Sequence, residues 1–163
     1  MFSKRIVSAL RSPFLATRRY FEDQDPRFAI AFAPALLVSI VLYVRSPLSN
    51  YIFDEQEALL ANPYVNGGDL PFWGAFQRDF WGLPPERSIG SYRPIPNLVW
   101  RLLWHVSQQP FIHHWVNVIG HAVNGALLAA FVFAVSGRRR LGWLCGAVFM
   151  TAAVLTEAVS GVV

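Results

Sequence analysis

The stretch 51-YIFDEQEALLANP-63 places three carboxylates just beyond a hydrophobic segment long enough to cross, or nearly cross, a lipid bilayer. The carboxylates belong to Asp54, Glu55 and Glu57. Residues 54–61 are predicted to form a short helix, because acids in a first turn interact favourably with the helix dipole and because a residue before proline is steered out of the helical region. Acids in this position either begin a solvated helix or belong to a reactive site at a membrane surface.

The composition favours a membrane protein. Of the 163 residues 54% are hydrophobic and 15% are charged, and the mean hydropathy is +0.35. Thirteen Phe, six Trp and five Tyr are typical of aromatic belts at membrane interfaces. A net charge of +4 is too small for a nucleic-acid partner. The single cysteine, Cys145, excludes disulfides and cysteine metal sites within this chain.

Three segments are predicted to span the membrane, which makes the chain an all-α integral membrane protein. Within the first span, residues 28–44, Ala29 to Val44 is a run of sixteen uncharged residues, about 24 Å of helix, slightly less than a hydrocarbon core of about 30 Å. Residues 112–135 include the clearest span, and residues 141–163 are interrupted only by Glu157 and small hydroxyl residues.

The topology follows from the two basic clusters. Basic residues prefer the cytoplasmic side, so the tail 1–27 and the turn 136–140, with Arg138–Arg140, are predicted to lie inside. The tail is also expected to be attracted to anionic lipid. An even number of crossings then leaves residues 45–111 as a long outer, periplasmic loop. The expected location is the inner (plasma) membrane, with the N-terminus in the cytoplasm.

The outer loop is predicted to carry amphipathic helices that lie in the membrane interface. Residues 94–106 are too few to span, and Asn97, Arg101 and His105 recur at every fourth position as a polar stripe. Aromatic residues between Phe72 and Trp81 recur at three- and four-residue spacing, which favours an interfacial helix. Residues 82–90 are predicted to form an exposed loop.

Polar residues gather on one face of the second span. His114, Asn117, His121 and Asn124, with His113 beside them, cover an arc of about 100°. Polar groups in a bilayer are costly unless they face protein or a water-filled cavity, so this face is predicted to pack inward, onto other helices of this or another chain or onto a polar pocket. A metal site is not predicted, because the spacing of the three histidines suits only two at a time.

Several charged groups converge on the outer side. Glu157 lies sixteen residues into the third span, about 24 Å from the inner face, which places it on the side of the loop acids. Arg93 and Arg101 suit a phosphate or pyrophosphate. Acids beside arginines favour chemistry on a lipid-linked phosphorylated substrate, whereas the alternative is an ordinary surface of balanced charges.

Six short motifs in this order resemble the start of a GT-C fold glycosyltransferase. The closest likeness is to transmembrane proteins with tetratricopeptide repeats that act as protein O-mannosyltransferases. The motifs are Phe53-Asp54-Glu55, Asn62-Pro63-Tyr64-Val65, Asp79-Phe80-Trp81-Gly82, Ser91-Tyr92-Arg93-Pro94, His114-Trp115-Val116-Asn117-Val118 and Thr156-Glu157-Ala158-Val159.

The resemblance implies sugar transfer from a polyprenyl-phosphate donor on the outer side of the membrane. By position, Asp54 matches the family's general base on the acceptor hydroxyl, with Glu55 its neighbour, sometimes assisted by a divalent metal such as Mg²⁺ or Mn²⁺. Arg93 becomes a candidate for the donor phosphate. The full set of candidate substrate-binding residues is Arg93, Arg101, His114, Asn117 and Glu157.

The family pattern continues beyond the Glu157 motif with a further acidic residue and many more spans, whereas this chain ends at Val163. We therefore expect an N-terminal module that is not active as this chain alone and that partners membrane lipid and further transmembrane helices. The alternative is a small non-catalytic membrane subunit that packs its polar helix face against a larger complex.

Overall fold

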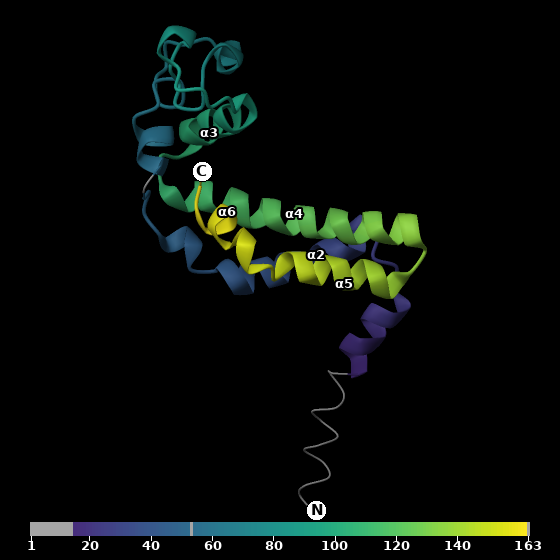
Figure 1. The fold of residues 1–163 in the computed structure, drawn as a ribbon. Helices are drawn as coiled ribbons and strands as arrows, with labels where there is room; N and C mark the ends of the chain where they lie inside the picture. The colour runs from purple at the N-terminus through teal and green to yellow at the C-terminus, as the bar shows by residue number, and fades with distance from the viewer. Residues whose placement is uncertain (1–14, 53, 163) are drawn as a thin grey trace, which may run out of the picture. The chain divides into compact units, whose positions relative to one another are not determined.

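The computed structural model describes residues 15–52 and 54–162, and every regular element among them is helical (Figure 1). The predicted all-α class is therefore confirmed for this part of the chain. The chain divides into two compact units. The hairpin unit comprises Met1–Leu42 and Ile119–Ala153, and the loop unit comprises Tyr43–Val118 and Val154–Val163. Residues 1–14 of the predicted basic tail, Phe53 and Val163 lie outside the described residues.

The hairpin unit contains a helix over residues 15–23, most of α2 (Phe28–Tyr43), the C-terminal part of α4 (Pro110–Ser136) and α5 (Arg139–Met150). Gly137 ends α4 with φ +66°, and its N–H donates to the Phe133 carbonyl at 2.8 Å, a left-handed cap that suits glycine. Helices α2, α4 and α5 run side by side (Figure 1). The buried apolar cluster consists of Ala31, Ala35, Ala122, Ala126, Ala129 and Met150.

One helix in the described part of the chain, α4, is long and apolar enough to cross a membrane, and the apolar helix α2 has 16 residues. The predicted span over residues 141–163 is not a single helix. It is divided into α5, the 3₁₀ helix η5 (Ala153–Leu155) and α6 (Thr156–Ser160), which pass the same test only when counted together. The Thr151 hydroxyl donates to the Ala147 carbonyl at 2.9 Å, a local bond that competes with the helical ladder where α5 ends.

The loop unit has a packed core of its own, and its elements are short. They are η1 (Ser46–Leu48), the π-helix η2 (Gln56–Leu60), the 3₁₀ helices η3 (Phe72–Gln77) and η4 (Pro85–Arg87), α3 (Pro94–Val106), the start of α4, and α6. The helix predicted at residues 94–106 is confirmed with its bounds. The core cluster consists of Ala58, Leu59, Tyr64, Val65, Ala75, Phe80, Trp100 and Val162.

The interfacial helix predicted between Phe72 and Trp81 is wrong beyond Gln77. The chain forms only the short η3, and Phe80 is buried in the core rather than exposed on a helix. The Asp79 carboxylate accepts hydrogen bonds from the N–H groups of Trp81 at 3.1 Å and Leu83 at 2.8 Å. These local bonds hold the backbone in a turn, because an Asp side chain offers the backbone an alternative to helical bonding.

Candidate functional site

The acidic stretch begins with one helical turn that passes into a π-helix. Asp54 and Glu55 are helical, η2 follows, and the Ala61 N–H donates to the Gln56 carbonyl five residues earlier at 2.9 Å. The helix predicted over residues 54–61 is thus confirmed to within one residue, and it ends before Asn62-Pro63 as expected. Single π turns are frequent at functional sites, so this turn marks the acidic stretch as a candidate.

Glu55 is buried, with 3% of its surface exposed, and both of its carboxylate oxygens accept hydrogen bonds from backbone N–H groups. Oε2 accepts from Ile52 at 2.9 Å, a capping bond across the first turn. Oε1 accepts from Val162, which ties the acidic stretch to the segment after α6. Asp54 next to it is exposed and makes no hydrogen bond or ion pair with the described residues. Asp54 therefore presents the accessible carboxylate of the two.

A cavity of about 600 Å³ lies in the loop unit and collects three of the predicted substrate-binding residues. Arg93 precedes α3, Asn117 lies on α4 and Glu157 lies in the first turn of α6. The cavity thus combines a cation, an amide and a carboxylate with an apolar wall, the usual composition of a small-molecule site. The wall is formed by Ile95, Pro96, Val99, Trp100, Val116, Val154, Ala158 and Val162.

The wall after α6 is held in place by side chains from three other elements. The Asn117 amide donates to the Gly161 carbonyl, and the Ser46 hydroxyl donates to the Ser160 carbonyl at 2.8 Å. Glu55 accepts from the N–H of Val162, the residue after Gly161. Glu55 of the acidic stretch is therefore connected by a hydrogen bond to Val162 in the cavity wall.

Arg101 does not line the cavity. Its guanidinium lies 4.7 Å from the centroid of the Tyr64 ring and donates to the Leu70 carbonyl, and only 7% of the residue is exposed. Asn97 on the same stripe is fully buried and donates to the Asp79 carbonyl at 3.1 Å. The predicted polar stripe of α3 therefore faces the protein core, except for the exposed His105, and the apolar residues Leu102 and Val106 are exposed outside the cavity.

The histidines at the start of α4 face inward, as predicted. His113 Nδ1 lies 2.9 Å from the Tyr51 hydroxyl and 3.2 Å from the Gln109 carbonyl, while the Tyr51 hydroxyl donates to the Gln108 carbonyl at 3.2 Å. These contacts fit a His113 that carries its proton on Nδ1. His114 Nδ1 lies 3.4 Å from Ser46 Oγ, so His114 supports the wall and does not line the cavity.

Burial first, and then the charge of Glu55, raise the pKa of Tyr51 from 10.0 to about 12. The neutral hydroxyl of Tyr51 thus persists beside His113 at physiological pH. This pair was missed by the sequence reasoning, which treated Tyr51 only as the start of the acidic stretch.

The rest of the polar stripe on α4 behaves differently. His121 is buried in the hairpin unit, where Nε2 lies 3.2 Å from the Met150 carbonyl. Asn124 is exposed, so it does not pack against the described part of this chain. Among residues 15–52 and 54–162, no group of three or more His, Cys, Asp or Glu side chains is arranged to hold a metal ion.

The motif residues Asn62, Asp79 and Gly82 form a scaffold whose role the sequence alone did not reveal. Asn62 Oδ1 accepts from the N–H groups of Tyr64 and Val65 at 2.9 and 3.2 Å, and its amide donates to the Phe80 carbonyl at 3.0 Å. Gly82 has φ +77°, and a Cβ there would lie 2.1 Å from Asn62 Oδ1. The one available signal was local: Asn and Asp side chains at turns commonly bond the backbone two residues on.

Over residues 15–52 and 54–162, these features define a helical protein with one membrane-length helix and a folded loop unit that carries a polar-lined cavity. The family of the chain is shown by its similarity to curated relatives. The chain is 34% identical over 130 residues to protein O-mannosyl-transferase Tmtc2 of Drosophila melanogaster, covering 77% of the chain and 14% of the relative. It is 35% identical to human TMTC1 over 141 residues (83% and 16%) and 37% identical to mouse TMTC1 over 139 residues (82% and 15%), both also named protein O-mannosyl-transferases.

The resemblance to protein O-mannosyltransferases is therefore confirmed over about four fifths of the chain. The chain spans only 14–16% of the length of these three relatives. No family model and no solved structure matches it.

Proposed function

We propose that this chain is the N-terminal module of a protein O-mannosyltransferase with a GT-C fold that takes mannose from a polyprenyl-phosphate donor. Sequence similarity to proteins named O-mannosyl-transferases supports the reaction class. The observation that carries the proposal is the cavity of about 600 Å³ in which Arg93, Asn117 and Glu157 meet. Its volume lies within the range of about 300–1,000 Å³ found for small-molecule sites.

In this proposal the cavity binds the donor. The Arg93 guanidinium holds the phosphate, for which its planar set of N–H donors is well suited. The Glu157 carboxylate and the Asn117 amide offer hydrogen bonds to sugar hydroxyls, although the amide already donates to Gly161. The apolar wall takes the first part of the polyprenyl chain.

Asp54 acts as the general base. It accepts the proton of the acceptor hydroxyl, the hydroxyl oxygen forms a bond to the anomeric carbon with inversion, and the bond to the donor phosphate breaks, so that polyprenyl phosphate leaves. Glu55 positions this turn through its bonds to Ile52 and Val162. The described residues do not assemble a divalent-metal site by themselves, so no step is assigned to Mg²⁺ or Mn²⁺.

The proposed location is the inner (plasma) membrane. The membrane-length helix α4 and the apolar helix α2 support this placement, and the segment from α5 to α6 supplies a third, bent crossing. With Arg138–Arg140 in the cytoplasm, the acidic stretch and Glu157 lie on the outer side.

The test is mannosyl transfer from polyprenyl-phosphate mannose to a Ser/Thr peptide, in membranes that contain the complete protein. Asp54→Asn should lower kcat by about 10²–10⁴-fold, the usual contribution of a general base. Glu57→Gln is the matched control, because Glu57 is a second exposed acid on the same turn. Transfer that survives Asp54→Asn unchanged would sink the assigned role, and a complete protein without transfer activity would favour the non-catalytic subunit.

A further inference from the structure

The hairpin unit contains a second cavity, of about 580 Å³, which the proposed transfer reaction does not use. Its wall is almost entirely apolar and combines larger side chains with six Gly or Ala residues: Ala31, Ala35, Gly125, Ala129, Gly146 and Ala147. Arg140 and Met150, both on α5, also line the cavity, and ten residues of helix correspond to about 15 Å. The cavity is therefore elongated along α5.

The charged residues of the lining are confined to one end. Arg18 and Glu22 come from the helix over residues 15–23, and Arg140 comes from the first turn of α5. Glu22 Oε1 is shared between Arg18 Nε at 3.1 Å and an Arg140 terminal nitrogen at 3.8 Å. Two cations thus share one anion, and the terminal N–H groups of Arg18 remain available for another oxyanion.

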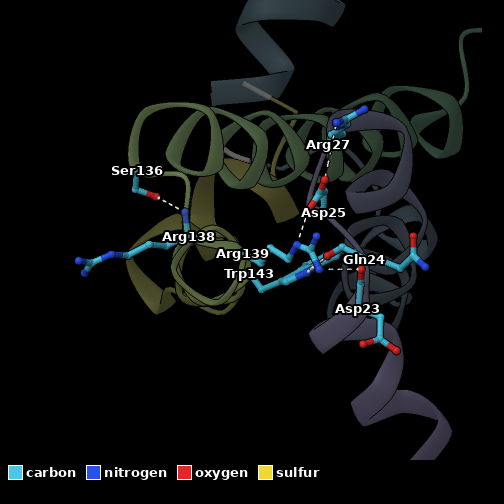
Figure 2. A network of polar contacts seen from close by, with 8 residues as sticks. All are labelled: Asp23, Gln24, Asp25, Arg27, Ser136, Arg138, Arg139 and Trp143. Carbon is cyan, nitrogen blue, oxygen red and sulfur yellow. Dashed lines mark hydrogen bonds and ion pairs between the residues drawn. The ribbon is translucent and has the colours of Figure 1, made fainter.

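The surroundings of this end are also basic. Residues 15–27 and 136–140 hold six arginines against three carboxylates. The Asp25 carboxylate forms ion pairs with Arg139 and, at 3.6 Å, with Arg27. Arg139 also donates to the Asp23 carbonyl at 3.1 Å and Trp143 Nε1 to the Gln24 carbonyl at 3.2 Å, which fix the helix 15–23 against α5 (Figure 2). Arg138 points away from this network in Figure 2.

We propose that this cavity is a binding site for an anionic phospholipid. The phosphate binds the terminal N–H groups of Arg18 and Arg140 that Glu22 leaves unoccupied, and one acyl chain lies along α5 over the small residues. Charge complementarity favours this occupant, because basic pockets beside membrane helices recognise anionic headgroups. The alternative occupant, a neutral apolar helix, would not neutralise the excess positive charge at this end of the cavity. The inference rests on the proposed membrane location but not on the transferase activity.

The test is native mass spectrometry of the detergent-purified full-length protein, mixed with equal amounts of phosphatidylglycerol and phosphatidylcholine. The wild type should retain phosphatidylglycerol preferentially. The double variant Arg18→Gln/Arg140→Gln should lose that preference by about thirtyfold, as expected for two arginines near an anionic headgroup. The control Arg19→Gln/Arg138→Gln removes the same charge from residues outside the cavity lining and should keep the preference.

A second pair of variants tests the acyl-chain wall. Ala147→Phe introduces a large ring into the cavity and should reduce retention of phosphatidylglycerol. Val148→Phe places the same ring on a residue that is 61% exposed and outside the lining, and should leave retention unchanged.

Equal losses in the two arginine doubles would overturn the site in favour of diffuse attraction. Equal retention of both lipids would also overturn it while leaving the membrane location intact, whereas retention of neither would overturn both. A lipid-free dimer that Ala147→Phe disrupts would show that the cavity takes a second copy of this chain.

Discussion

The loop unit and the hairpin unit are stabilised internally by different kinds of interaction. In the loop unit, buried polar side chains bond the backbone: Asn62 makes three such bonds, and Asp79 accepts three, from Trp81, Leu83 and Ile89. In the hairpin unit, small residues let the helices pack closely, and ion pairs connect Glu22 and Asp25 to Arg140 and Arg139 of α5. Most of the family motifs therefore specify a polar scaffold, and only a few of the motif residues remain free for chemistry.

The largest expected effect on stability comes from removing a polar connector of the loop unit. Asp79→Ala leaves three backbone N–H groups without their acceptor and should lower the free energy of unfolding by about 3–5 kcal/mol. Denaturant unfolding of the purified protein, followed by tryptophan fluorescence, measures it. The control Asp69→Ala changes an exposed acid and should stay within about 0.5 kcal/mol. Equal effects of the two variants would break the comparison between the units.

The next effect separates backbone strain from steric conflict at two glycines. Gly82→Ala should cost about 3 kcal/mol, because a left-handed backbone is unfavourable for alanine and the new Cβ meets Asn62 Oδ1. Gly90 has φ +90°, and a Cβ added there would have no neighbouring atom within 4 Å, so Gly90→Ala should cost only about 1–2 kcal/mol. The same unfolding measurement checks both. Similar costs would mean that the contact of Gly82 with Asn62 contributes nothing.

A smaller effect is expected at the helix contact of the hairpin unit. A Cβ on Gly142 would lie 2.7 Å from the Ala129 carbonyl oxygen and 2.8 Å from Pro26 Cγ. Gly142→Ala should therefore destabilise by about 1–3 kcal/mol through overpacking. Gly120→Ala, where no such neighbour lies within 4 Å, should be neutral or stabilising by up to about 1 kcal/mol. Thermal unfolding of both variants gives the comparison, and a stabilised Gly142→Ala would contradict close packing there.

The smallest effect is a pH dependence at Tyr51. Its pKa is raised to about 12, so its contribution to stability is complete below pH 10 and is lost as the pH rises through 12. The difference between the ultraviolet titrations of the wild type and Tyr51→Phe should show one phenol that ionises near pH 12. A midpoint near 10 would place Tyr51 in solvent and break its contact with His113.

The sequence predicted the elements that depend on local patterns. The bounds of α3 follow from Pro94 at its start and the apolar pattern to Val106, and the inward face of α4 follows from the cost of exposing His113 and His114 to lipid. It failed where hydrogen bonds from side chains to the nearby backbone override the periodicity. Asp79 turns the aromatic run of residues 72–81 out of a helix, and Thr151 bonds back to Ala147 where α5 ends.

The candidate site was predicted in part. Arg93, Asn117 and Glu157 meet in one cavity, although they are distant in sequence. Arg101 looked equivalent to Arg93 by charge alone, but the position of the Tyr64 ring, which is a tertiary feature, places Arg101 in the core. Likewise, Asp54 is exposed, whereas its neighbour Glu55 is buried and accepts a hydrogen bond from the distant Val162 N–H. These distinctions depend on long-range contacts that local sequence does not encode.

The most direct test of the central claim is photo-crosslinking of the complete protein with a polyprenyl-phosphate analogue that carries a photoreactive group beside the phosphate, followed by peptide mapping. The expected labels fall on residues 93–100, 116–117 and 154–162, the three segments that contribute to the lining of the loop-unit cavity, and labelling is lost in Arg93→Ala. Labelling that persists at full strength in Arg93→Ala, or that falls outside these segments, would contradict the assignment of this cavity to the donor.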